Sequence, residues 1–255
     1  MRYCLSYNAF SQNWKNADEV SIKYSEDKGL VNFMEQLKDK RIVLIVPQHF
    51  SESEIKKLIA IKKIYSQYNF VVCLPTYKED TVTSFRANGI PFYVAEPCFT
   101  WEQLNFFAKE GVSDILIGGD LGFSLPKVKK YLIENFPSIH LRAAANLSMS
   151  EYNGTDPIKG FFIRPEDVRV YEQYIDTIEF ININLEESLY NIYTNNFFVG
   201  GLNVLIYRVD EPIDNSIIPK SFAEKRVSCE RKCLKGAKCN LCQYIIRLNE
   251  NKNNE

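Results

Sequence analysis

Four cysteines near the end of the chain form the clearest chemical pattern in the sequence. Cys229, Cys233, Cys239 and Cys242 follow the spacing C-x3-C-x5-C-x2-C within a short polar segment. Four thiolates complete a tetrahedral site for Zn²⁺ or ligate an iron–sulfur cluster, and the spacing alone does not choose between the two. Free thiols or a redox disulfide are the alternative without a metal. We expect a metal centre held by these four side chains.

Basic residues surround the cysteines. The set is Arg226, Arg231, Lys232, Lys235 and Lys238. Four thiolates carry a large negative charge, which these cations would offset. The same cations are also typical of a small patch that faces RNA.

The composition is that of an ordinary globular protein. The chain has 255 residues, 45% of them hydrophobic and 25% charged, with a formal net charge of −1. This length can bury a core in one large domain or two small ones. No apolar run is long enough to span a bilayer and no signal-peptide pattern opens the chain, so we expect a soluble cytoplasmic protein. The near-neutral charge argues against extensive nucleic-acid coating, and the oligomeric state stays open.

The stretch from Gly111 to Ser148 predicts one strand–helix–strand unit. Residues 114–117 are a short apolar strand that ends at a glycine turn, and apolar residues then repeat at helical spacing up to Pro137. A second apolar stretch, residues 139–145, follows. The two strands must lie parallel with the helix on one face, and such units usually come in series.

Counting along the chain gives eight strands of this kind. We expect an α/β fold, a (β/α)8 TIM-like barrel over residues 1–184, with a small cysteine-rich appendage over residues 185–255. An open doubly wound sheet is the alternative. Residues 2–8 are interpreted as an opening strand or cap. The expected strands are residues 19–24, 42–46, 70–74, 92–95, 114–117, 141–145, 161–163 and 177–181.

Strand alternation predicts charged side chains inside the barrel. If the apolar residues of each strand face the helices, the polar ones face inward: Glu19 and Lys23, Arg142, Arg164, and Glu179. Buried charges must be paired or must meet a ligand. One interpretation is an anion site in which Arg142 and Arg164 bind a carboxylate or phosphate. The other is an ion-pair network that closes the barrel floor.

Polar residues at the carboxyl ends of the strands are the other candidates, because barrel enzymes place their chemistry there. Neither histidine has a neighbouring serine or cysteine in a hydrolase motif, so a hydrolytic triad is not predicted. With the inward-facing residues, the predicted substrate-binding set is Lys23, Gln48, His49, Glu96, Asp120, Arg142, Asn146, Arg164, Glu166 and Glu179.

Three segments resemble the U32 family, which is labelled as peptidases and includes tRNA, rRNA and ubiquinone hydroxylation proteins. GVSDILIGGDLGFSLPKVKKY, continuing to IHLRAAANLS, is similar to the family's central run. GFFIRPEDVRVYEQYIDTIEF is similar to its following strands, and RVSCERKC to a segment whose cysteines ligate an iron–sulfur cluster. The chain departs from the family at Ala143, Ala144 and Ala145, where the family has Ser-Thr-Gln, and in the close spacing of Cys239 and Cys242.

The resemblance implies a barrel and a cluster. The leading hypothesis is a U32-like protein with a four-cysteine centre, [4Fe–4S] rather than Zn²⁺, acting in hydroxylation-type modification of RNA or a small aromatic compound. The alternative is a non-catalytic binding or structural protein whose tail is clamped by zinc. A U32-type peptidase is a third reading, which no nucleophile or catalytic zinc motif supports.

Overall fold

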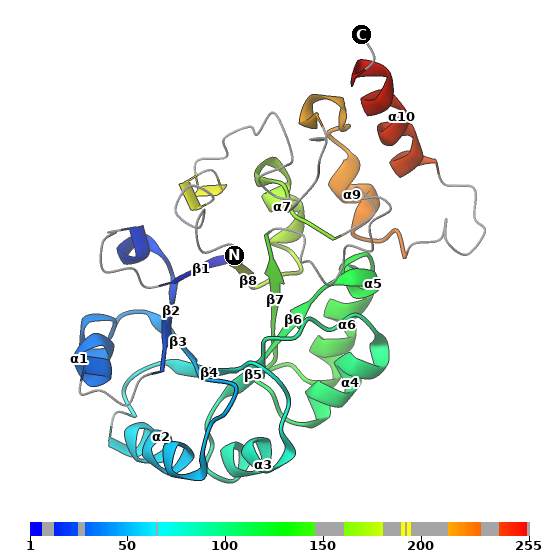
Figure 1. The fold of residues 1–255 in the computed structure, drawn as a ribbon. Coiled ribbons are helices and arrows are strands. Elements are labelled where there is room, and N and C mark those ends of the chain that lie inside the picture. The colour runs from blue at the N-terminus through cyan, green and yellow to red at the C-terminus, as the bar shows by residue number, and fades with distance from the viewer. Residues whose placement is uncertain are drawn as a thin grey trace.

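Eight parallel strands form one sheet that curls into a nearly closed barrel (Figure 1). The computed structural model describes residues 1–6, 13–24, 29–64, 66–145, 161–180, 190–191, 193–194, 214–230 and 240–253. The sheet order is β5-β4-β3-β2-β1-β8-β7-β6, so β1 lies between β2 and β8. The strands are β1 (Arg2–Ser6), β2 (Glu19–Lys23), β3 (Arg41–Ile45), β4 (Phe70–Leu74), β5 (Phe92–Val94), β6 (Asp114–Ile117), β7 (His140–Ala144) and β8 (Thr177–Glu179).

The seam of the barrel lies between β5 and β6. At the start of the two strands, the amide of Ser113 donates to the carbonyl of Phe92 at 2.8 Å. Further along, the amide of Cys98 donates to Leu116 at 2.7 Å and that of Gly118 to Cys98 at 3.0 Å. These bonds bring the two edge strands together, which confirms the predicted barrel over the open sheet.

Helices follow the strands and surround the barrel (Figure 1). They alternate with the strands from β2 to β7, as expected for parallel units. The helices are α1 (Gly29–Gln36), α2 (Glu52–Ile64), α3 (Glu79–Ala87), α4 (Trp101–Lys109), α5 (Gly119–Gly122), α6 (Leu125–Asn135), α7 (Val168–Tyr171), α9 (Phe222–Arg226) and α10 (Leu241–Asn253), with 3-10 turns η1 (Asn13–Asn16), η3 (Pro165–Asp167) and η5 (Asn215–Ile217).

The strands separate two groups of buried apolar residues. The larger cluster fills the space between sheet and helices and includes Val20, Ile42 and Leu44. The smaller lies inside the barrel and comprises Cys4, Val43, Val71, Cys73 and Tyr93. Alternate residues of one strand, such as Ile42 and Val43, belong to different clusters, so the predicted division of each strand into an outer and an inner face is confirmed.

The prediction of one of the eight strands, residues 161–163, is wrong. Residues 161–163 form no strand; among the described residues, the amide of Ile163 donates to the carbonyl of Ala145 beside β7 at 3.1 Å. The eighth strand of the barrel is β1, which pairs with β2 on one side and with β8 on the other. Cys4 lies opposite Glu19 of β2, and Arg2 lies opposite Thr177 of β8. Since residues 161–163 are not part of the barrel wall, Arg164 and Glu166 do not face its interior.

The C-terminal segment packs on the same core as the barrel. Phe222, Ala223 and Val227 are buried in the larger apolar cluster together with the strands. In Figure 1, α9 lies beside α7, and α10 lies farther out from the barrel. None of the helices in the described ranges has both the length and the apolarity needed to cross a membrane.

Candidate functional site

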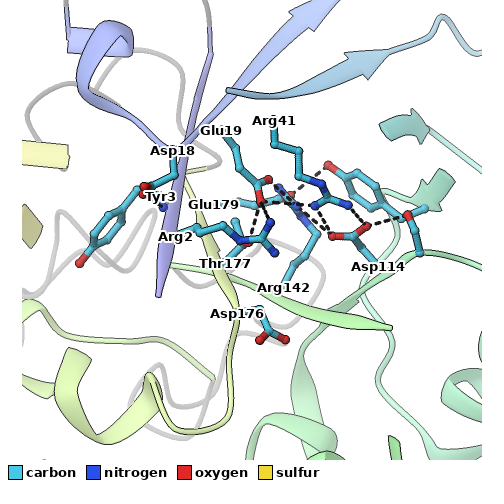
Figure 2. A network of polar contacts seen from close by, with 12 residues as sticks. Arg2, Tyr3, Asp18, Glu19, Arg41, Asp114, Arg142, Asp176, Thr177 and Glu179 are labelled. Atoms are coloured by element: carbon cyan, nitrogen blue, oxygen red, sulfur yellow. Dashed lines mark hydrogen bonds and ion pairs between the residues drawn. The ribbon is translucent and has the colours of Figure 1, made fainter. Parts of the chain in front are cut away.

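Charged side chains from four strands meet inside the barrel (Figure 2). Arg41 of β3 donates from Nη1 and Nη2 to the two carboxylate oxygens of Asp114 in β6, both at 2.6 Å. Arg142 of β7 donates from Nη1 to Glu19 of β2 at 2.6 Å and to Asp114 at 3.1 Å. Glu19, Asp114 and Arg41 begin their strands, so this network lies at the amino-terminal end of the barrel, its floor.

Additional donors complete the floor. Glu19 accepts from Arg2 at 3.1 Å, from Arg41 at 3.3 Å and from the hydroxyl of Thr177 at 3.0 Å. Glu19 and Arg142 are wholly buried. Charges removed from water to this extent are tolerated because each is paired and hydrogen-bonded. Of the two interpretations of the inward charges, the geometry supports the ion-pair network over the anion site.

The pairing fixes the ionisation of the floor. Burial acts to raise the pKa of Asp114, but the hydrogen bond from Arg41 and the charges of Arg142 and Arg41 outweigh it and lower the pKa to about 2. Burial acts to lower the pKa of Arg41 and Arg142, and the neighbouring carboxylates raise both above the usual arginine value. Asp114, Arg41 and Arg142 are therefore charged at neutral pH.

Glu179 stands above the floor, at the carboxyl end of β8. Its Oε1 accepts from Arg142 Nε and, at 2.9 Å, from the hydroxyl of Tyr93. Burial, followed by the charge of Glu179, raises the pKa of Tyr93 well above its usual value. Burial likewise raises the pKa of the Cys73 thiol to about 12, so this thiol is not a nucleophile at neutral pH.

Exposure increases from the floor toward the carboxyl ends of the strands. Glu19 and Arg142 have side-chain exposures of 0%, whereas Glu179 reaches 16%. Ala95 and Ala144 are half-buried, and Lys23 at the end of β2 is exposed. Among the described residues, exposure thus increases toward the carboxyl end of the barrel, which we call the mouth. This is the end at which barrel enzymes bind substrates.

The other predicted residues at strand ends lie at or near the surface. Gln48, His49 and Glu96 are exposed, and the carbonyl of Gln48 accepts from Lys78 Nζ at 2.6 Å. Asp120 is exposed in α5 and lines a pocket of about 260 Å³ with Phe99, Ser124, Lys127 and Glu230. Asn146 lies outside the described residues.

Arg164 and Arg142 do not form one anion site, contrary to the expectation from the sequence. Arg164 donates to both oxygens of Asp167, at 2.5 and 2.8 Å, and to Asn215 at 2.9 Å. Asn215 in turn donates to Glu166. Arg164 thereby ties the connection before β8 to the C-terminal segment, at the base of a pocket of about 400 Å³ that Lys220 also lines.

Two of the four candidate metal ligands lie within the described ranges. Cys229 follows α9 and Cys242 lies in α10; both are half-buried against the larger core cluster. Cys233 and Cys239 lie outside these ranges, and the described residues alone contain no group of three metal-ligating side chains. Arg226 lies near both described thiols, between the rings of Phe123, Phe162 and Phe222 at 4.7 to 4.8 Å.

Several residues that contact the interior charges are absent from the predicted set, among them Arg2, Arg41, Asp114 and Tyr93. Arg41 was left out because the strand was expected to start one residue later, at Ile42. Asp114 was placed in a strand but not recognised as an inward charge. Tyr93 lies in an apolar strand, but its position between the outward-facing Phe92 and Val94 predicts that its side chain faces the barrel interior.

Comparison with known proteins finds no matching family model and no matching curated protein. A solved structure described as a 4-hydroxy-2-oxoglutarate aldolase/2-deydro-3-deoxyphosphogluconate aldolase aligns at a TM-score of 0.33 with 13% identity, over 67% of this chain and 88% of that one. A cube-shaped porous cage designed by fusing oligomeric domains aligns at 0.38 with 10% identity, over 99% of this chain and 83% of that one. Neither likeness bears on what this chain does.

Proposed function

We propose that this chain is a U32-like barrel protein with a four-cysteine metal centre, acting in hydroxylation-type modification of RNA or a small aromatic compound. The substrate would enter at the mouth. Lys23, His49 and Glu96 are exposed at or after the carboxyl ends of their strands, and Glu179 is half-buried at the end of β8. The ligands would be Cys229, Cys233, Cys239 and Cys242, holding [4Fe–4S] in preference to Zn²⁺.

The observation that carries this proposal is the placement of Cys229 and Cys242. They come from opposite ends of the cysteine pattern, yet both lie near the buried guanidinium of Arg226. Burial lowers the pKa of Arg226, and the neighbouring Tyr171, Cys242, Asp167 and Cys229 act to raise it. A cation held beside two thiols suits a centre whose thiolate ligands are anionic.

The segment that bears Cys229 is fixed at the carboxyl side of β6. The amide of Leu125 donates to the carbonyl of Val227 at 3.0 Å, and the amide of Glu230 donates to Phe123 at 2.8 Å. In each bond the partner of the C-terminal segment, Leu125 or Phe123, belongs to the α5–α6 region that directly follows β6. A cluster there would supply one-electron redox chemistry when bound. The protein's own residues would hold the substrate at the mouth and limit its exposure to water.

Metal analysis of anaerobically purified full-length protein tests the proposal. We expect brown protein with broad absorption near roughly 400 nm and about four irons per chain, the content of one cluster. Cys233→Ser should lose the metal, whereas Cys98→Ser, which alters a buried thiol at the β5–β6 seam, should keep it. Metal-free wild-type protein purified under these conditions would refute the centre.

A zinc clamp without catalysis is the second candidate. Its support is the packing of Phe222 and Val227 on the barrel core, which is what a structural tail requires. Colourless protein with one zinc per chain would favour it. Removal of that zinc should then loosen residues 214–253 without changing any reaction at the mouth.

A further inference from the structure

Arg142 and Glu179 are joined by only one hydrogen bond. An arginine and a carboxylate normally close two parallel bonds, one from Nε and one from Nη2. Here Nε donates to Oε1, and Tyr93 donates to the same oxygen. Within the described part of the chain, neither Nη2 of Arg142 nor Oε2 of Glu179 has a hydrogen-bond partner. The pair therefore holds a spare donor beside a spare acceptor.

Tyr93 explains why the pair stays open. Its hydroxyl donates to Oε1 of Glu179 at 2.9 Å, and the centre of its ring lies 4.8 Å from the guanidinium carbon of Arg142. The cation–π contact offsets part of the cost of burying an unpaired donor. Because Nε and Nη2 share one edge of the planar guanidinium, the spare donor faces the side of Glu179 and not the floor.

The walls above Glu179 are built from small or apolar side chains. Ser21, Ala95 and Ala144 take inward positions near the carboxyl ends of β2, β5 and β7, with Ile45 at the end of β3. Ordinary barrels fill such positions with bulky branched residues. Ala95, Ala144 and Ile45 are half-buried, so the described surface around Glu179 toward the mouth is mainly apolar.

We propose that Glu179 and Arg142 bind the amide edge of a small planar lactam at the mouth. The N–H of the ligand would donate to Oε2 of Glu179, and its adjacent carbonyl oxygen would accept from Nη2 of Arg142. An anion would meet the Glu179 carboxylate and a cation would meet the Arg142 guanidinium, so a neutral donor–acceptor edge is the best complement. The apolar walls suit a flat ring.

This inference deepens the proposed function and rests on it only for the location of the site at the mouth. No metal takes part in the contact. The site can therefore fail while the metal centre is confirmed, and the reverse also holds.

Binding of 2-pyridone to the full-length protein tests the proposal, with N-methyl-2-pyridone as the matched probe that lacks the N–H. Titration calorimetry or ligand-detected NMR should show saturable binding of 2-pyridone with a Kd of about 1 mM, as expected of so small a ligand. The N-methyl compound should bind roughly tenfold more weakly, because one hydrogen bond to a charged group is lost. Equal binding of the two probes, or no binding of either, would overturn the proposal.

Glu179→Gln gives the sharpest variant. The glutamine carbonyl can still accept from Arg142 and Tyr93, but its NH₂ group puts a donor where the spare acceptor was. Binding of 2-pyridone should weaken roughly tenfold and the preference over the N-methyl probe should vanish. Glu134→Gln on the exposed face of α6 is the matched control and should bind as the wild type does. An unchanged preference in Glu179→Gln would contradict the assignment.

Tyr93→Phe tests the same site without altering any group that touches the ligand. Without the hydroxyl, Oε1 is released and the Arg142–Glu179 pair can close its second bond, which removes the spare donor and acceptor together. We expect binding of 2-pyridone to be lost, with circular dichroism showing a folded barrel. Folded Tyr93→Phe that binds 2-pyridone as the wild type does would refute the role of the open pair.

Discussion

Arg142 illustrates how a single inward residue can serve the fold and a site at once. Its Nη1 is committed to Glu19 and Asp114 on the floor, while its Nε reaches Glu179 toward the mouth. The first set of contacts balances buried charge, and only the upper edge is left for a ligand. A substitution of Arg142 therefore tests the floor before it tests binding.

Arg142→Met is expected to destabilise the protein severely. The variant leaves Glu19 and Asp114 buried with fewer cations, and breaking a buried ion pair costs about 3–5 kcal/mol. Urea unfolding should show a lower midpoint or no folded state. Arg169→Met, an exposed arginine of α7, should change stability by less than about 0.5 kcal/mol. A fully stable Arg142→Met would instead make Arg142 purely a binding residue.

The floor also predicts a loss of stability in acid. The pKa of Asp114 is about 2 in the folded protein, below its ordinary value of 3.8, so the unfolded chain binds more protons between these values. Stability from this group is complete above about pH 4 and falls as the pH drops toward 2. The total is about 2 kcal/mol. Free energies of unfolding measured from pH 5 to pH 2 should show this slope.

Asp114→Asn is the check on that assignment. Asparagine cannot ionise, so the slope attributable to this position should disappear. The protein should also be less stable at pH 7, because Arg41 and Arg142 each lose one carboxylate partner. Wild type and variant with the same pH dependence would show that other carboxylates control acid unfolding.

The inward direction of Arg142 and Glu179 could be predicted from alternation along strands, but their partners could not. Which strands lie opposite one another depends on how the barrel closes, and Arg41 and Asp114 are 73 residues apart in sequence. Arg164 lies outside the interior for a related reason: alternation predicts an inward side chain only within a strand, and residues 161–163 form none.

Among the elements, short local signals were sufficient for most helices and strands. Two helices begin with capping boxes that local sequence specifies: Thr100 with Gln103 at α4, and Ser51 with Glu54 before α2. The strand at residues 2–6 was hard to recognise because nothing local distinguishes an opening strand from a cap. Its identity depends on long-range pairing with β8, which only the closed barrel provides.

The glycine turn after β6 is an element with a demanding geometry. Gly119 has a φ of +48°, and a Cβ there would lie 2.7 Å from Cδ1 of Phe99. Gly119→Ala should therefore cost about 1–3 kcal/mol through backbone strain and overpacking. Gly89, with a φ of +62° and no atom within 4 Å of a Cβ, is the matched control for strain alone. Thermal unfolding should rank Gly119→Ala below Gly89→Ala.

In the whole molecule, the C-terminal segment and the barrel share one apolar core. Phe222 is 1% exposed and lies between two guanidinium groups, with Arg164 at 5.3 Å and Arg226 at 4.7 Å from its ring. Arg164 is hydrogen-bonded to Asp167 in the connection before β8, and Arg226 lies near Cys229 and Cys242. The expected split into a barrel of residues 1–184 and an appendage of 185–255 stays a prediction, and this stack is where it can be tested.

Phe222→Ala distinguishes the two arrangements. Replacing a buried phenylalanine by alanine lowers the free energy of unfolding by about 3–5 kcal/mol, either of the whole protein or of the C-terminal segment alone. If the segment folds together with the barrel, amide hydrogen exchange should accelerate in β7 and β8 as well as in residues 214–230, because the whole unit unfolds more often. If the segment is separate, only residues 214–230 should exchange faster, with the barrel amides protected as in the wild type. Lys225→Ala, an exposed change in the same helix, should alter neither pattern.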